Sequence, residues 1–130
     1  MNKDEQNQQE LMMKLGVFEQ QIRQLQQQIA AIDQALTDMT LLNTGLDELV
    51  GKKDKEIFAP IGRGIFARAK LISEDLLVDI GDKKLIKKNI PQTKEMVAKQ
   101  IRKIQDVKKD LEQNLEQVGK ETERILGASQ

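Results

Sequence analysis

The stretch that decides the fold is residues 56–72, EIFAPIGRGIFARAKLI. It begins with a short apolar run rich in strand formers, and Gly62-Arg63-Gly64 then predicts a tight turn. Pro60 cannot donate a ladder hydrogen bond, so its strand should lie at a sheet edge or end there. Side chains then alternate between two faces, as in a β-strand, with Ile65, Ala67, Ala69 and Leu71 on one and Phe66, Arg68, Lys70 and Ile72 on the other.

A second unit of the same kind follows. Ser73-Glu74-Asp75 predicts a polar turn into residues 76–80, and Gly81-Asp82 predicts another turn into residues 84–88. Four short strands with little to pack against leave edges that invite pairing with another chain. We therefore expect residues 52–89 to form two β-hairpins that serve subunit assembly, through Phe58, Pro60, Ile61, Gly62, Gly64, Phe66, Leu71, Leu77, Val78, Ile80 and Gly81.

Heptad repeats of apolar residues flank this block and predict helices over residues 5–50 and 90–126. The first seam contains Leu11, Leu15, Phe18, Ile22, Leu25, Ile29, Ile32, Leu36, Met39, Asn43, Leu46 and Val50. The second contains Ile90, Lys94, Val97, Ile101, Ile104, Lys108, Leu111, Leu115, Val118, Thr122 and Ile125.

The ends of the helices carry capping signals. Asn89 and Gln92 form a predicted capping pair, while Gly51 and Gly127 are expected to end the two helices. The predicted fold is mainly α, a single domain over residues 1–130 in which a long antiparallel coiled-coil hairpin has two β-hairpins at its bend. Pairing of the helices between chains is the alternative that periodicity leaves open.

Composition excludes most enzymatic chemistry. The chain has no cysteine and no histidine, and only 2% of its residues are aromatic. Thiol and imidazole catalysis and the usual zinc sites are therefore ruled out, and we expect no catalytic residue, metal or cofactor. The chain also has no long apolar run and a polar start, so we expect neither a membrane span nor a signal peptide, and a cytoplasmic location.

Two segments resemble the α class of the prefoldin family, a co-chaperone. Residues 59–66, APIGRGIF, resemble its Pro-apolar-Gly-x-Gly segment, and residues 77–81, LVDIG, are similar to the strand end that follows. The presence of two hairpins also fits the α class, since β-class subunits have one. The resemblance implies a heterohexamer of two α-class and four β-class subunits that holds non-native polypeptides at coiled-coil ends and passes them to a group II chaperonin without nucleotide hydrolysis.

A candidate binding surface for such polypeptides lies near the start of the first helix. Met12, Met13 and Val17 fall off the seam at heptad positions e, f and c, where flexible methionine side chains suit irregular apolar partners. The full predicted site is Leu11, Met12, Met13, Leu15, Val17, Phe18, Ile125 and Leu126. The alternative is that the two methionines are simply tolerated in a frayed helix end.

Basic residues on the outward face of the second helix have several interpretations. Lys99, Arg102, Lys103 and Lys109 indicate either a solvated helix face or docking onto an acidic partner. Binding to nucleic acid fits poorly, because no aromatic stacking residues are interleaved with these charges. For the whole chain, the alternative to a chaperone subunit is a structural tether or adaptor that oligomerises through its β block.

Overall fold

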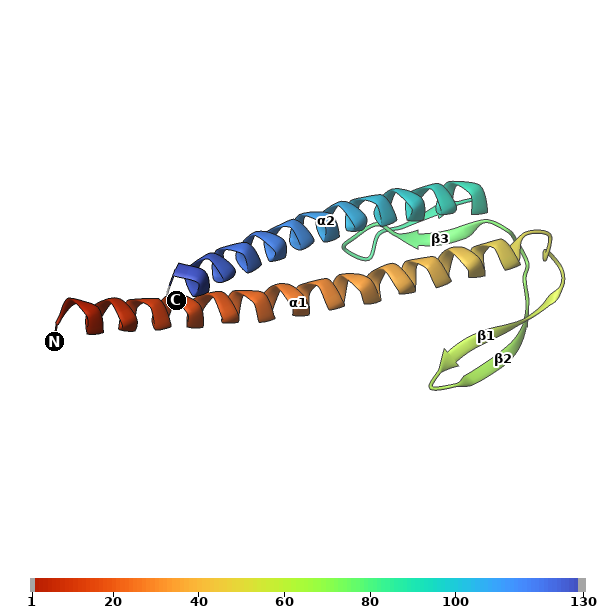
Figure 1. The fold of residues 1–130 in the computed structure, drawn as a ribbon. Helices are drawn as coiled ribbons and strands as arrows, with labels where there is room; N and C mark the ends of the chain where they lie inside the picture. The colour runs from red at the N-terminus through yellow and green to blue at the C-terminus, as the bar shows by residue number, and fades with distance from the viewer. Residues whose placement is uncertain (1, 129–130) are drawn as a thin grey trace. The chain divides into compact units, whose positions relative to one another are not determined.

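The computed structural model describes residues 2–128 and contains two long helices and four short strands (Figure 1). In chain order, the elements are α1 (Lys3–Leu49), β1 (Glu56–Gly62), β2 (Ile65–Lys70), β3 (Leu76–Asp79), β4 (Leu85–Lys88) and α2 (Ile90–Ala128). The predicted helical hairpin with two β-hairpins is confirmed. The chain divides into two compact units, a helical unit of residues up to Leu36 and from Lys103 onward, and a β unit of Thr37–Arg102.

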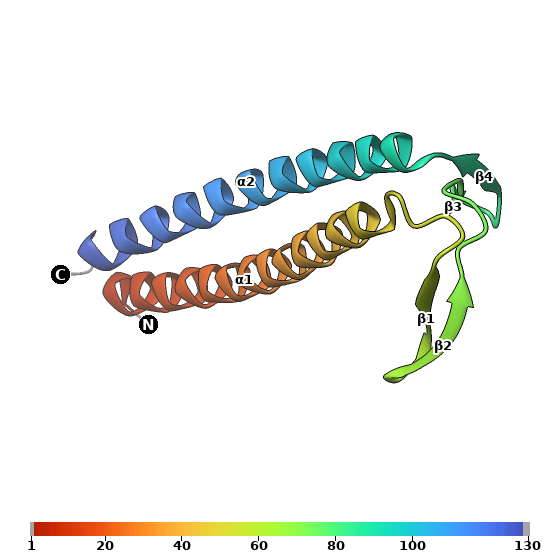
Figure 2. The same cartoon turned by 90° about the vertical axis from the view of Figure 1, so that its right-hand side faces the viewer.

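In the helical unit, α1 and α2 lie side by side and run in opposite directions within one chain (Figures 1 and 2). The predicted heptad residues from Leu11 to Leu36 and from Ile104 to Ile125 are half-buried, whereas most of their neighbours are exposed. One interhelical ion pair joins Lys108 Nζ to Asp33 Oδ1 at 2.7 Å. The heptad pattern therefore identified the face along which the two helices meet.

The β unit contains the best-buried side chains among the described residues. Leu46 of α1 packs with Ile90 and Val97 of α2, and Met39, Leu49, Leu76 and Ile101 lie against this cluster. Because Leu76 belongs to β3, the second hairpin is attached to the helix core through an apolar contact. Lys94 of α2 also forms an ion pair with Asp47 of α1.

The start of α2 is fixed by the predicted capping pair. The Gln92 amide donates to Asn89 Oδ1 at 2.8 Å, and the Asn89 amide donates to Gln92 Oε1 at 3.1 Å. These reciprocal bonds satisfy two backbone donors at the helix terminus. At the other helix, the Glu5 amide donates to Asn2 Oδ1 at 2.9 Å, so α1 begins two residues earlier than predicted.

Two predictions at helix ends are wrong. Val50 was assigned to the seam, but α1 ends at Leu49 and the Val50 side chain is 59% exposed. Gly51 follows with a φ of 75°, and its amide donates to Glu74 Oε1 at 2.6 Å, so the chain leaves the helix before another seam position is reached. Gly127 was expected to end the second helix, but α2 continues to Ala128.

The strands form two separate antiparallel hairpins, β1 with β2 and β3 with β4. In the first, Gly62 pairs with Ile65, so Arg63 and Gly64 form the turn with positive φ values of 50° and 79°. A two-residue hairpin turn of this type needs positive φ at both positions, which favours glycine. The ladder shifts between Pro60 and Gly62, next to the strand end where a proline is tolerated.

Candidate functional site

The predicted apolar patch of the helical unit is exposed. Met12 and Met13 are each 72% exposed, and Val17 and Leu126 are also exposed. We call these four residues the distal patch. The other predicted residues, Leu11, Leu15, Phe18 and Ile125, are half-buried along the seam. Because the helices are antiparallel, the start of α1 and the end of α2 lie at the same end of the unit, so the seam continues into the exposed surface (Figure 2).

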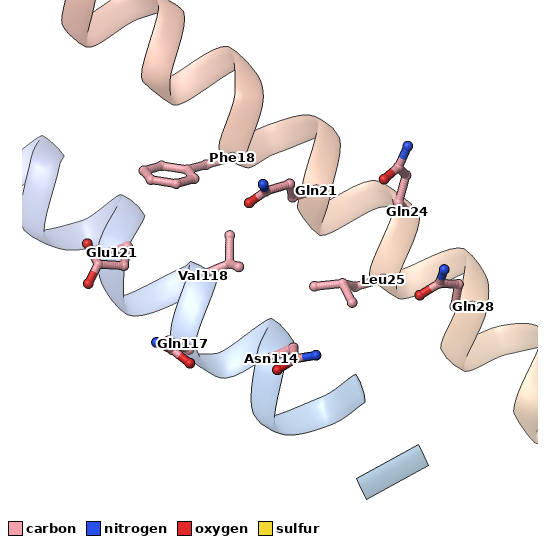
Figure 3. Close-up of a pocket in the computed structure, with 9 residues that line it drawn as sticks. All are labelled: Phe18, Gln21, Gln24, Leu25, Gln28, Asn114, Gln117, Val118 and Glu121. Carbon is pink, nitrogen blue, oxygen red and sulfur yellow. The ribbon is translucent and has the colours of Figure 1, made fainter. Parts of the chain in front are cut away.

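A groove runs beside the seam of the helical unit, with a volume of about 340 Å³. Figure 3 shows Val118 of α2 pointing between Phe18 and Leu25 of α1. Side-chain amides make up most of the remaining lining, from Gln21, Gln24, Gln28, Asn114 and Gln117, together with Glu121. The sequence prediction missed this groove, although its signal is visible, because Gln21, Gln28 and Asn114 all occupy heptad position g next to the seam.

Aromatic side chains are exposed on the first hairpin. Phe58 is 67% and Phe66 is 59% exposed, although the whole chain contains only three phenylalanines. Both lie on the face opposite to Ala67 and Ala69, which are half-buried. The two phenylalanines therefore form an exposed apolar patch on one face of the first hairpin.

An ion pair lies on the same face of the first hairpin as the two phenylalanines. Arg68 donates to both carboxylate oxygens of Glu56, from Nε at 2.8 Å and from its terminal nitrogen at 3.1 Å. This bond raises the pKa of Arg68 above its ordinary value. Because this pair is bidentate, it holds the Arg68 side chain in one orientation on the exposed strand.

The second hairpin also has an exposed apolar face. Leu77 and Leu85 are exposed on one face, whereas Leu76, Val78 and Ile86 are half-buried on the opposite face. Ile80, which follows the end of β3, is also exposed. Among the predicted assembly residues, Phe58, Pro60, Ile61, Phe66, Leu77 and Ile80 are exposed, Leu71 and Val78 are half-buried, and Gly62, Gly64 and Gly81 lie at the turns with positive φ. The prediction missed Ile65, Ile72 and Leu85, which are equally exposed.

A wider groove lies between the end of α1 and β1 in the β unit. Its volume is about 1070 Å³, and its lining includes Leu49 and Val50 from the helix end and Phe58 and Pro60 from the strand. The apolar surface of the first hairpin therefore continues to the helix. Among residues 2–128, no group of three or more acidic side chains is placed to hold a metal ion, and no helix is long and apolar enough to cross a membrane.

Comparisons with known proteins agree with this architecture. A family model described as prefoldin subunit matches residues 18–128. The prefoldin subunit alpha of Methanobrevibacter smithii is 33% identical over 110 residues, covering 84% of this chain and 70% of that protein. The one from Methanococcus vannielii is 26% identical over 128 residues, covering 98% and 84%.

Among solved structures, filamentous PFD from Methanocaldococcus jannaschii has the same fold, with a TM-score of 0.78 and 16% identity over 88% of this chain and 97% of that one. The family model spans α1 from residue 18 onward, both hairpins and α2, and both of these relatives are α-class subunits. The chain therefore belongs to the prefoldin family and is a chaperone subunit of the α class.

Proposed function

We propose that the whole chain acts as one prefoldin domain that holds non-native polypeptides on its distal patch and assembles through its hairpins. Two copies would join four β-class subunits, and the complex would pass its clients to a group II chaperonin in the cytoplasm, without catalysis or nucleotide. The single observation that carries client binding is the exposure of the three apolar side chains of Met12, Met13 and Val17 near the start of α1.

The chemistry of the distal patch suits clients without a fixed shape. Methionine is unbranched and polarisable, so it can fit many apolar side chains without a defined pocket. Each contact is weak, since burial of apolar surface contributes roughly 25 cal/mol per Å². Several subunits in one complex would add such contacts within a single client, which raises the overall affinity through effective concentration.

The exposed faces of the hairpins support the assembly half of the proposal. Phe58 and Phe66 on one hairpin and Leu77 and Leu85 on the other would be covered in a complex, and each two-stranded sheet has open edges that another strand can pair with. Half-buried Leu71 and Val78 then contribute to the fold of the hairpins within the subunit rather than to contacts between subunits.

The client site is tested by replacing Met12, Met13 and Val17 with serine in the assembled complex. We expect the variant to lose suppression of aggregation of a denatured protein, while native mass spectrometry shows an unchanged complex. Val17→Ser alone should weaken suppression, whereas Val107→Ser should not, although Val107 is exposed to a similar degree on α2. Unchanged suppression by the triple variant would refute the site.

Assembly is tested separately, by measuring the native mass of the chain mixed with a β-class subunit. A mass of two α with four β subunits is the expected result. A structural tether, the competing function, would form neither this complex nor any particle that delays aggregation. Self-association into long particles without the β-class subunit would contradict the proposed stoichiometry.

A further inference from the structure

Two lysines interrupt the apolar seam of α2, and each has an aspartate partner on α1. Lys94 pairs with Asp47 in the β unit, and Lys108 pairs with Asp33 in the helical unit at 2.7 Å. The two lysines are fourteen residues apart, and so are the two aspartates, in the opposite order. Both ion pairs therefore belong to the same antiparallel register of the two helices.

The apolar seam alone cannot define this register. Its residues repeat every seven positions on both helices, so a slide of one heptad would again place apolar side chains opposite apolar side chains. The connection does not define it either, because α1 and α2 are separated by residues 50–89, which contain two hairpins rather than a short helix-helix turn. Some other feature must select one register.

The charged residues alternate with neutral ones in the same heptad column. On α1, Gln26 and Thr40 occupy the positions one heptad before Asp33 and Asp47. A slide of one heptad would place Lys108 opposite Thr40 or Gln26, depending on its direction. On α2, the equivalent neighbours of the lysines are Ile101 and Leu115, so a slide would also place an aspartate opposite a large apolar side chain.

A slide of two heptads would bring Lys94 opposite Asp33 and restore a charge pair. It would also separate Leu46 from Val97, two of the best-buried side chains among the described residues. Any slide would separate this cluster, so the core of the β unit opposes slides of both lengths, and the ion pairs add a further preference against the shorter one.

We propose that the pairs Lys94–Asp47 and Lys108–Asp33 are positioning residues that set the register of α1 and α2 and so place the end of α2 at the distal patch. In this register, Ile125 lies at the level of Leu15. A slide of one heptad would move Ile125 along α1 by about 10 Å, at 1.5 Å per residue. The consequence for client binding rests on the proposed function, whereas the register itself does not.

Cross-linking can measure the register, because the chain has no cysteine of its own. Gln28 and Asn114 line the same groove on opposite helices and lie at flanking heptad positions (Figure 3). Cysteines at these two positions report the native register with a short thiol-specific reagent. Cysteine at position 28 combined with cysteine at Val107 or at Glu121, one heptad away on α2, reports a slide in either direction.

The test compares these three cysteine pairs in the full chain with and without Lys94→Leu and Lys108→Leu. Native lysines should give intramolecular cross-links only in the pair with Asn114. Two partly exposed ion pairs favour one register by roughly two- to thirty-fold, so the leucine variant should also cross-link in a slid pair. A matched control, Lys99→Leu with Lys109→Leu, removes two outward lysines from the same helix and should keep the native pattern.

The proposal is overturned if the leucine variant cross-links only in the native pair. If that variant loses its helical circular dichroism, the double variant Asp33→Asn with Asp47→Asn removes the same ion pairs from the α1 side. Cross-links in a slid pair would then support the proposal, and cross-links in the native pair alone would overturn it. If the two ion pairs only stabilised the helices, their removal would lower the unfolding midpoint, but cross-links would still form only in the native cysteine pair. In assembled complexes, variants with a slid register should also suppress aggregation less well. If the cross-links change but suppression does not, client binding at the distal patch is contradicted and the register proposal stands.

Discussion

Val97 offers the sharpest test of where the subunit derives its stability. Its side chain is 2% exposed and packs with Leu46 and Ile90. Val97→Ala removes the equivalent of two buried methylene groups, which is about 1.6 kcal/mol of transfer free energy at 0.8 kcal/mol each. The cavity left behind adds to this, so we expect a total destabilisation of about 2–3 kcal/mol.

The same helix provides a matched control. Val107 is 47% exposed, so Val107→Ala should change the free energy of unfolding by less than about 0.5 kcal/mol. Denaturant unfolding of the full chain, followed by helical circular dichroism at one protein concentration, measures both variants. A fixed concentration is needed because assembly adds to the apparent stability. Equal effects of the two alanine substitutions would refute the placement of the core at the β unit.

Three further predictions concern polar groups along the helices. The buried Oδ1 of Asn43 has no hydrogen-bond partner among the described residues, so Asn43→Leu should stabilise the chain by about 1–2 kcal/mol in the same unfolding assay. Asn89→Ala removes the side-chain acceptor of the Gln92 amide at the start of α2 and should destabilise by about 1 kcal/mol, with a loss of helical signal near the melting midpoint; an unchanged midpoint would contradict the capping role. The hydrogen bond from Lys108 to Asp33 raises the pKa of Lys108, so its stabilisation is complete below the unfolded-state pKa and is lost as pH rises through the higher folded-state value. The difference in the free energy of unfolding between the wild type and Lys108→Met should therefore stay constant around neutral pH and shrink only above about pH 10.5. A difference that already shrinks near pH 8 would exclude this ion pair as its cause.

Much of the fold follows from periodicity in the sequence. The heptad residues of both helices are the ones that the structure partly buries, because the seven-residue spacing keeps one face of each helix toward the other. Periodicity fails at Val50, where the correct spacing continues but a turn with positive φ at Gly51 has already redirected the chain. A heptad count contains no information about such a turn, nor about the carboxylate of Glu74 that binds the Gly51 amide.

The candidate surfaces were less predictable than the helices. Met13 and Val17 could be identified because their heptad positions, f and c, face away from the seam, and Met12 because its position, e, lies beside the seam rather than in it. In a hairpin, alternation defines two faces but does not say which one the rest of the subunit covers. Leu71 and Val78 were therefore grouped with exposed residues, while Ile72 and Leu85 were left out. In the second hairpin, the contact of Leu76 with the helix core determines which face is covered. This contact joins residues far apart in the sequence, so alternation within the strand does not predict it.

The distribution of burial connects these surfaces with the ion pairs of the seam. Among the described residues, the well-buried apolar side chains are Leu46, Ile90 and Val97, and all three belong to the β unit. Among the described residues of the helical unit, no apolar side chain is well buried, so its packing discriminates weakly between registers of equal period. A two-helix seam with exposed methionines beside it cannot also enclose a large core. Polar pairs such as Lys108–Asp33 solve this problem, since they add specificity without closing the surface that the clients would use.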